Sequence, residues 1–183
     1  MRKIQYIGAA LLLGGCVNEL LTIHIEQEGS GVVEGASVLG ELLTALTIGG
    51  FDDLSVNIEQ ELANQGVDPG DISAVHVTEL VLSTPDGEDL SFLDTIAITI
   101  VSPGLEEVRI AHAESFPEGV TSVALTLDDV DLTEYVVAES LTVNTEASGT
   151  LPAEDTTIHV LMGIDVTATV QGAAKQADRA DEL

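Results

Sequence analysis

The positions of hydrophobic and polar residues predict a chain built mainly from β-strands. Between residues 20 and 27 the sequence LLTIHIEQ alternates apolar and polar positions, which is typical of a strand with one buried face. Other strand-like segments, rich in β-branched residues, are separated by turns that contain Gly, Pro and Asp. These predicted strands cover residues 31–38, 72–83, 95–102, 106–113, 121–130, 139–147 and 156–170. We expect the strand at 72–83, which is long, to contain a bulge, and those at 95–102 and 106–113 to form a hairpin.

One segment has a different period. In residues 51–65 the apolar positions Phe51, Leu54, Ile58 and Leu62 recur at intervals of three and four, and a glycine follows, so this segment predicts an amphipathic helix. About eight short strands, with turns between them and one short helix, favour an all-β fold. We predict an antiparallel β-sandwich.

The glycine-rich sequence EGSGVVEG at residues 28–35 lies directly after the first predicted strand. A dinucleotide-binding loop also follows a strand, but it opens a helix, and the residues after this sequence read as a strand. We therefore interpret 28–35 as a hairpin turn. The sequences DPGD at 68–71 and TPDGED at 84–89 predict further turns.

The first residues have the layout of a secretory signal, with a positive start, a short apolar stretch and two glycines before Cys16. Cys16 is the only cysteine, so no disulfide can form within the chain. The sequence LGGC at 13–16 resembles the lipobox of bacterial lipoproteins. The resemblance implies that the cysteine sulfur receives a diacylglycerol, that the chain is cut before Cys16, and that the new amino terminus is acylated, for example with palmitate.

The lipobox resemblance, the strand pattern and the polar, alanine-rich composition of the last residues together predict the organisation of the chain. We expect a signal peptide at 1–15, a lipidated cysteine and short tether at 16–19, a β-sandwich domain at 20–171 and a polar C-terminal tail at 172–183. Val17 follows the cysteine where an aspartate would favour retention at the inner membrane. Among Gram-negative lipoproteins this favours the outer membrane, and in other cells the anchor would hold the protein at the plasma membrane.

The charge of the chain is strongly negative. It has 32 acidic and 5 basic residues, for a formal net charge of −27, and cleavage would also remove Arg2 and Lys3. Yet 45% of the residues are hydrophobic, which indicates a folded domain with an acidic surface rather than a disordered acidic segment. This balance resembles that of proteins from halophiles. The three remaining basic residues cannot neutralise a track of phosphates, which excludes nucleic acid as a partner.

Acidic turns are the candidates for a metal site. Loop carboxylates and carbonyl oxygens at one end of a sandwich can bind calcium, although none of these turns has the spacing of an EF-hand. The candidate ligands are Asp68, Asp71, Asp86, Asp89, Asp128, Asp129 and Asp131. The competing interpretation is that aspartate stabilises turns through hydrogen bonds to nearby backbone groups.

Histidines and serines give weaker signals. His24, His76, His112 and His159 each lie between apolar neighbours in a predicted strand, and we expect them to point to the polar face. Strand pairing could bring two of them together as zinc ligands, but no two have the sequence spacing of a ligand pair. Ser115 lies near His112, but no G-x-S-x-G motif supports a nucleophile.

The sequence thus favours a non-catalytic lipoprotein of the cell envelope. We expect the membrane as a partner through the lipid anchor, with an envelope protein as a further partner, and no cofactor other than calcium. Two alternatives are a calcium-dependent adhesion or binding module and a carrier of apolar ligands between the sheets.

Overall fold

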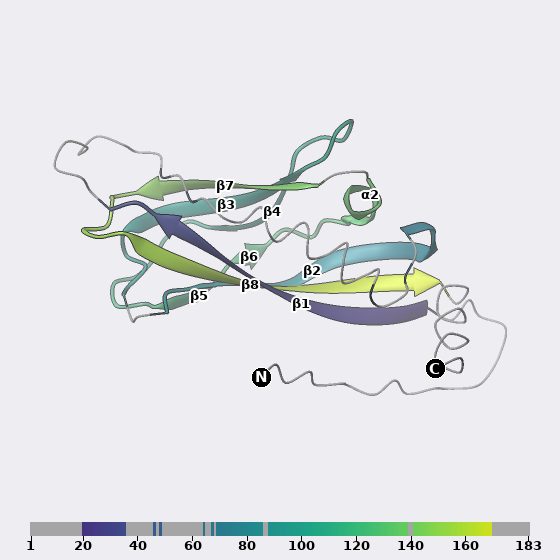
Figure 1. Ribbon diagram of the computed structural model, residues 1–183, viewed down its shortest axis with the longest axis horizontal. Coiled ribbons are helices and arrows are strands. Elements are labelled where there is room, and N and C mark those ends of the chain that lie inside the picture. The colour runs from purple at the N-terminus through teal and green to yellow at the C-terminus, as the bar shows by residue number, and fades with distance from the viewer. Residues whose placement is uncertain are drawn as a thin grey trace.

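The computed structural model describes residues 20–35, 46, 48, 64, 67, 69–85, 88–138 and 141–169, which form two four-stranded antiparallel sheets (Figure 1). In hydrogen-bonding order, the first sheet consists of β1 (Leu20–Val33), β8 (Thr156–Thr169), β2 (Ile72–Ser83) and β5 (Ser122–Ala124). The second sheet consists of β6 (Thr126–Leu127), β4 (Val108–Ala113), β3 (Leu93–Val101) and β7 (Thr142–Gly149). The described helices are a 3-10 turn, η1 (Pro69–Asp71), and the short α2 (Thr133–Val136). This architecture confirms the predicted all-β sandwich.

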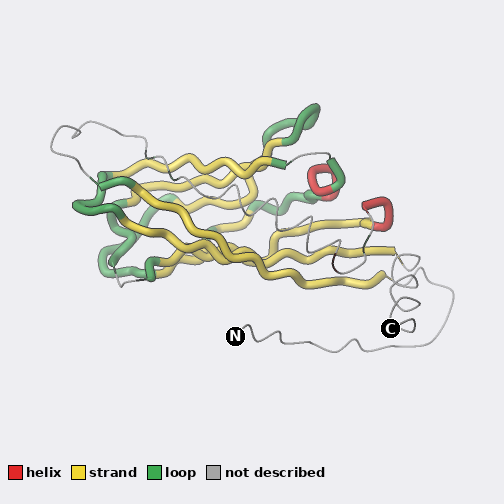
Figure 2. The backbone as a smooth tube through the Cα atoms, viewed as in Figure 1, coloured by secondary structure: helices red, strands yellow, loops and turns green. Residues whose placement is uncertain are grey.

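The core lies between the two sheets, which form separate layers in Figure 2. On β8, every second side chain from Ile158 to Ala168 is buried, because alternate residues of a strand point to opposite faces of the sheet. On β3, the side chains of Ile96, Ile98 and Ile100 are buried in the same way from the opposite layer. The intervening residues on each strand form the outer, polar faces of the sandwich.

The first strand is longer than the sequence predicts. β1 runs without a break from Leu20, opposite Thr169, to Val33, opposite Thr156. The predicted hairpin turn at 28–35 and the separate strand that follows it are therefore wrong. Gly29 and Gly31 lie within the β1–β8 ladder, where Gly31 is opposite Ile158, so pairing with a distant strand outweighs the local preference for a turn.

The predicted strand at 121–130 is divided. β5 pairs with β2 in the first sheet, whereas β6 pairs with β4 in the second. Between them, the backbone N–H of Leu125 donates to the carbonyl of Leu80, and the Leu125 side chain is buried. The segment therefore crosses from one layer to the other, and its alternating pattern continues through the crossing because both halves contribute apolar side chains to the same core.

The bulge and the hairpin that the sequence predicts are both present in the structure. β2 shows register shifts between Ile72 and Ala74 and between Val77 and Glu79, which confirms a bulged strand. β3 and β4 form the predicted antiparallel hairpin. The predicted helix at 51–65 lies outside the described residues except for Asn64, which is helical. Residues 1–19 and 172–183 also lie outside them. Within the described part, no helix has the length and apolar character needed to cross a lipid bilayer.

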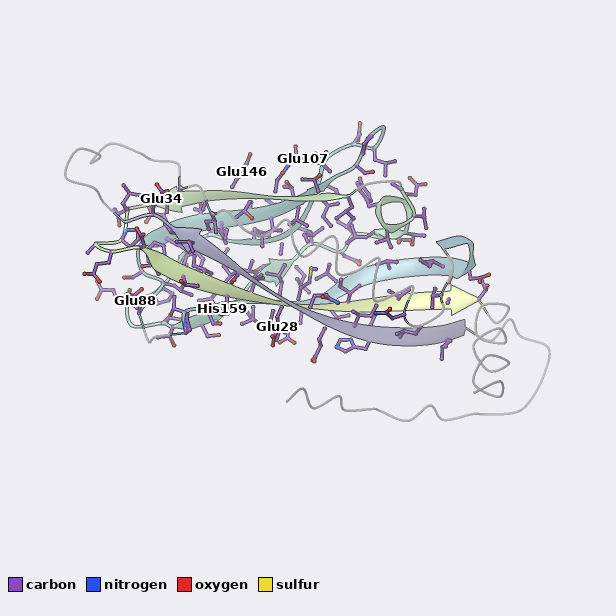
Figure 3. All side chains as sticks on the ribbon, viewed as in Figure 1. Glu28, Glu34, Glu88, Glu107, Glu146 and His159 are labelled. Atoms are coloured by element: carbon purple, nitrogen blue, oxygen red, sulfur yellow. The ribbon has the colours of Figure 1, made fainter. Side chains whose placement is uncertain are left out.

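The two ends of the sandwich differ in which chain segments they contain. Leu20 at the start of β1 lies opposite Thr169 at the end of β8, and Ile72 at the start of β2 pairs with Ala168. At the opposite end, β1 finishes beside the start of β8, and Figure 3 shows Glu34 and Glu88 there. This arrangement defines which end of the sandwich contains Leu20, the first residue of β1.

Candidate functional site

Asp89, one of the predicted calcium ligands, connects two loops. Its carboxylate accepts hydrogen bonds from the backbone N–H of Ser91, at 3.0 Å, and from the Ser91 hydroxyl. The backbone N–H of Gly119 donates to its other oxygen at 3.2 Å. The Ser91 hydroxyl, followed by these two N–H groups, lowers the pKa of Asp89. Asp89 thus acts as the acceptor that joins neighbouring turns.

Asp128 forms an ion pair with the only Arg or Lys between residues 20 and 169. Arg109 donates from Nε to Oδ2 at 2.7 Å and from Nη2 to Oδ1 at 3.3 Å. His112 Nδ1 lies 3.5 Å from the same Oδ2. The hydrogen bond from Arg109 lowers the pKa of Asp128 and raises the pKa of Arg109. The Asp128 carboxylate therefore neutralises a cation of the protein itself.

Asp131 joins α2 to the edge of β2. Its Oδ1 accepts hydrogen bonds from the hydroxyl and backbone N–H of Thr133, at 2.5 and 2.9 Å, and from the backbone N–H of Val75 at 3.3 Å. In addition, the backbone N–H of Leu132 donates a hydrogen bond to the carbonyl of Val75 at 2.8 Å. The Thr133 hydroxyl is the main cause that lowers the pKa of Asp131.

The acidic candidates do not form one site in the described part of the chain. Asp68 and Asp86 lie outside the described residues, Asp71 ends η1, and Asp129 is exposed next to Asp128. Within the described ranges, no group of three or more His, Cys, Asp or Glu side chains is arranged to hold a metal ion. Asp89 and Asp131 instead show the structural role that aspartate commonly has in turns.

A cluster of one histidine and two carboxylates lies on the outer face of the first sheet. The four histidines lie in strands β1, β2, β4 and β8, and none of them is buried. His24 on β1 is directly opposite Asp165 on β8, and its Nδ1 is 2.7 Å from Asp165 Oδ1. The other ring nitrogen, Nε2, is 4.0 Å from Oε1 of Glu26, two residues further along β1. The two carboxylates therefore flank both nitrogens of one imidazole.

Gly163 provides the space in which this imidazole lies. A Cβ atom at Gly163 would be 3.3 Å from Cε1 of His24 and 3.0 Å from Oγ1 of Thr78, so any larger residue would push against both. Thr78 reaches this position because the register shift between Val77 and Glu79 places it in a bulge, and bulges commonly re-aim side chains. The ring of His24 on β1 and the hydroxyl of Thr78 on β2 thus approach Gly163 from the two strands that flank β8.

A second histidine lies in the same row. His76 on β2 is opposite Asp165 from the other side, so His24, Asp165 and His76 form a line across three strands. His76 Nδ1, however, donates to the carbonyl of Val130 at 3.2 Å. The outward phase of each histidine could be read from the sequence, but the row could not, because His24 and Asp165 are 141 residues apart.

The fold places the chain among all-β proteins with two packed antiparallel sheets. Comparison of the chain with protein-family models, with curated proteins and with solved structures found no match.

Proposed function

We propose that this chain is a lipid-anchored protein of the cell envelope, with a β-sandwich that acts as a non-catalytic structural or protein-binding module. The observation that carries the proposal is the sequence LGGC at 13–16, which lies only a few residues before Leu20, where β1 begins. In lipoproteins that this motif resembles, the acylated cysteine becomes the first residue of the mature protein. A sheet that starts so close to this cysteine would be held directly by its lipid.

The length of the tether supports a definite orientation. Only Val17, Asn18 and Glu19 separate Cys16 from β1, and an extended chain covers at most about 3.6 Å per residue, or roughly 14 Å over this distance. In this proposal the end of the sandwich that contains Leu20 and Thr169 lies near the bilayer. The opposite end, near Glu34 and Glu88 in Figure 3, points away from it and is open to a partner.

The acidic surface supports a location in high salt. None of the described Asp or Glu residues is buried. In Figure 3, Glu107 and Glu146 extend from one side of the sandwich and Glu28 from the other, so the negative charge is spread over both faces. We propose an outer-membrane location in a Gram-negative cell, or the plasma membrane in a cell without an outer membrane, in contact with a saline medium.

The anchor can be tested by replacing Cys16 with Ala in the full chain. We expect labelled palmitate and glycerol to enter the wild-type protein and the Val17→Ala control, which keeps the thiol, but not the Cys16→Ala variant. The variant should keep the same far-ultraviolet circular dichroism, because the substitution lies outside the β-sandwich. Equal labelling of wild type and Cys16→Ala would refute the proposal.

A further inference from the structure

We propose that His24 and Glu26 bind a divalent transition-metal ion, such as Zn²⁺, on the outer face of the first sheet. In this site Nε2 of His24 and Oε1 of Glu26 are the two protein ligands, and Asp165 holds the imidazole in place. The inference goes beyond membrane anchoring and does not depend on it, because all three residues lie in β1 and β8.

The hydrogen bond to Asp165 determines which nitrogen of His24 is free. An ionised carboxylate has no proton to donate, so the 2.7 Å contact requires that Nδ1 of His24 carries the hydrogen. In the neutral imidazole the lone pair is then on Nε2. Histidines that bind metals nearly always donate their other ring N–H to a carboxylate, carbonyl or water in this way, which fixes the tautomer and the ring orientation.

The free nitrogen faces an oxygen at a distance suited to a shared ion. The separation of 4.0 Å between Nε2 of His24 and Oε1 of Glu26 is too long for a hydrogen bond. Two ligands of a tetrahedral zinc ion, each about 2.0–2.1 Å from the metal, are roughly 3.4 Å apart. The Glu26 side chain is 66% exposed, so a small torsional adjustment closes the difference.

The geometry of β1 allows His24 and Glu26 to bind the same metal ion. Residues two apart on a strand point to the same face, so His24 and Glu26 project together from β1. Two protein ligands leave open positions, which water or a group from a partner would fill. The site is therefore an open, exchangeable one rather than a closed structural site with four protein ligands.

Other features favour this histidine over the rest. Gly163 leaves room for the His24 ring to lie across β8, where a Cβ atom would be only 3.3 Å from Cε1 of the ring. The imidazole of His76 is bonded to a backbone carbonyl, and that of His112 shares its carboxylate with Arg109. The strongly negative chain raises the local concentration of any cation.

The ligand types identify the class of ion. Imidazole nitrogen suits zinc, copper and nickel, whereas magnesium and calcium prefer oxygen ligands alone. A nitrogen and a carboxylate together distinguish this position from the many carboxylates on the surface. An excess of magnesium would therefore fill weak carboxylate sites and leave the His24 site available to zinc.

The test is zinc titration of the full chain by calorimetry in the presence of millimolar magnesium. All proteins carry Cys16→Ala, so that a free thiol cannot bind the metal. We expect one zinc equivalent that binds at least tenfold more weakly in His24→Ala and 10–100-fold more weakly in Asp165→Ala, the usual cost of losing such an outer partner. His159→Ala is the matched control, since His159 is also exposed on the outer face of β8.

Imidazole resonances in nuclear magnetic resonance spectra give an independent measurement. Substoichiometric zinc should shift the signals of His24 and leave those of His159 unchanged. Unchanged affinity and stoichiometry in His24→Ala would overturn the proposal. So would zinc-induced shifts confined to histidines other than His24.

Discussion

At the scale of single residues, Asp131 shows how one carboxylate can satisfy several backbone groups. β2 pairs with β5 only at Val81, Leu82 and Ser83, so an edge of β2 extends beyond that pairing. At Val75 this edge donates to Asp131 and accepts from Leu132, which leaves less of it open to pairing with another chain. The same carboxylate oxygen bonds Thr133 at the start of α2.

We expect Asp131→Ala to lower the free energy of unfolding by about 1–2 kcal/mol, because the backbone N–H groups of Val75 and Thr133 lose their acceptor. Urea unfolding at pH 7 measures the change. Asp129→Ala is the matched control, since this neighbour is exposed and has no hydrogen bond of this kind, and it should change stability by no more than about 0.5 kcal/mol. Equal effects of both substitutions would contradict the assigned role.

The difference in the free energy of unfolding between wild type and Asp131→Ala should depend on pH. The pKa of Asp131 is lowered in the folded state by the bonds from Thr133 and Val75 and by the nearby His76. Because the pKa is lower in the folded state, the stabilisation by Asp131 is complete above the pKa of the unfolded state, about 3.9. It is lost as the pH falls through the pKa of the folded state. The gap between wild type and Asp131→Ala should therefore narrow below about pH 4.

At the scale of strands, the sequence predicted a strand correctly where its own pattern of apolar and polar residues matches the structure that it adopts in the sheet. β8 alternates between buried and outward residues along its length, whereas the alternation of β2 changes phase at its bulges, and both strands lie close to the predicted ranges. The predicted turn at 28–35 fails because β1 pairs with β8 over 14 residues, and long-range pairing decides the structure of a glycine-containing strand. α2 was not anticipated, since only four residues are helical and their first turn depends on Asp131.

The candidate site follows the same logic. The sequence correctly placed His24 in a strand and predicted its outward direction, because that requires only the alternation within β1. Its contact with Asp165 depends on the register between β1 and β8, and the space above Gly163 depends on a bulge in a third strand. Neither register nor bulge position is encoded in a local pattern, so this site could be found only in the folded chain.

Strand position also predicts local stability. β8 pairs with β1 on one side and β2 on the other, whereas β5 has three paired residues and β6 has two. We expect the backbone amides of β8 to exchange with deuterium most slowly and those of β5 and β6 most rapidly, because edge segments with few pairs open locally. Hydrogen exchange followed by mass spectrometry measures this order. Protection of β5 equal to that of β8 would contradict it.

At the scale of the whole molecule, charge opposes folding and the core favours it. The buried side chains of the two sheets form one apolar cluster, and the carboxylates of the described residues lie outside it. Arg109 is the only Arg or Lys between residues 20 and 169, and it is already paired with Asp128. Most of the negative charge is therefore compensated by mobile cations rather than by ion pairs within the protein.

We expect the melting temperature to rise by roughly 5–10 °C between about 0.05 and 2 M potassium chloride, a few kcal/mol for a domain of this size. Molar salt shortens the screening length to about 3 Å and so relieves the repulsion among surface carboxylates. Thermal unfolding followed by circular dichroism measures the change. Combined Glu28→Gln, Glu34→Gln and Glu146→Gln substitutions reduce the charge at exposed positions, and this variant should melt higher than wild type in dilute buffer.

The comparison of the two proteins separates charge repulsion from other effects of salt. If repulsion is the cause, the difference between wild type and the triple variant should shrink toward zero in 2 M potassium chloride, because screening has already removed what the substitutions remove. A melting temperature that is flat or falls with salt would contradict the proposed saline habitat. Stabilisation of the wild type by millimolar magnesium or calcium, far beyond the effect of ionic strength, would contradict the screening explanation and point to specific cation binding by the carboxylates.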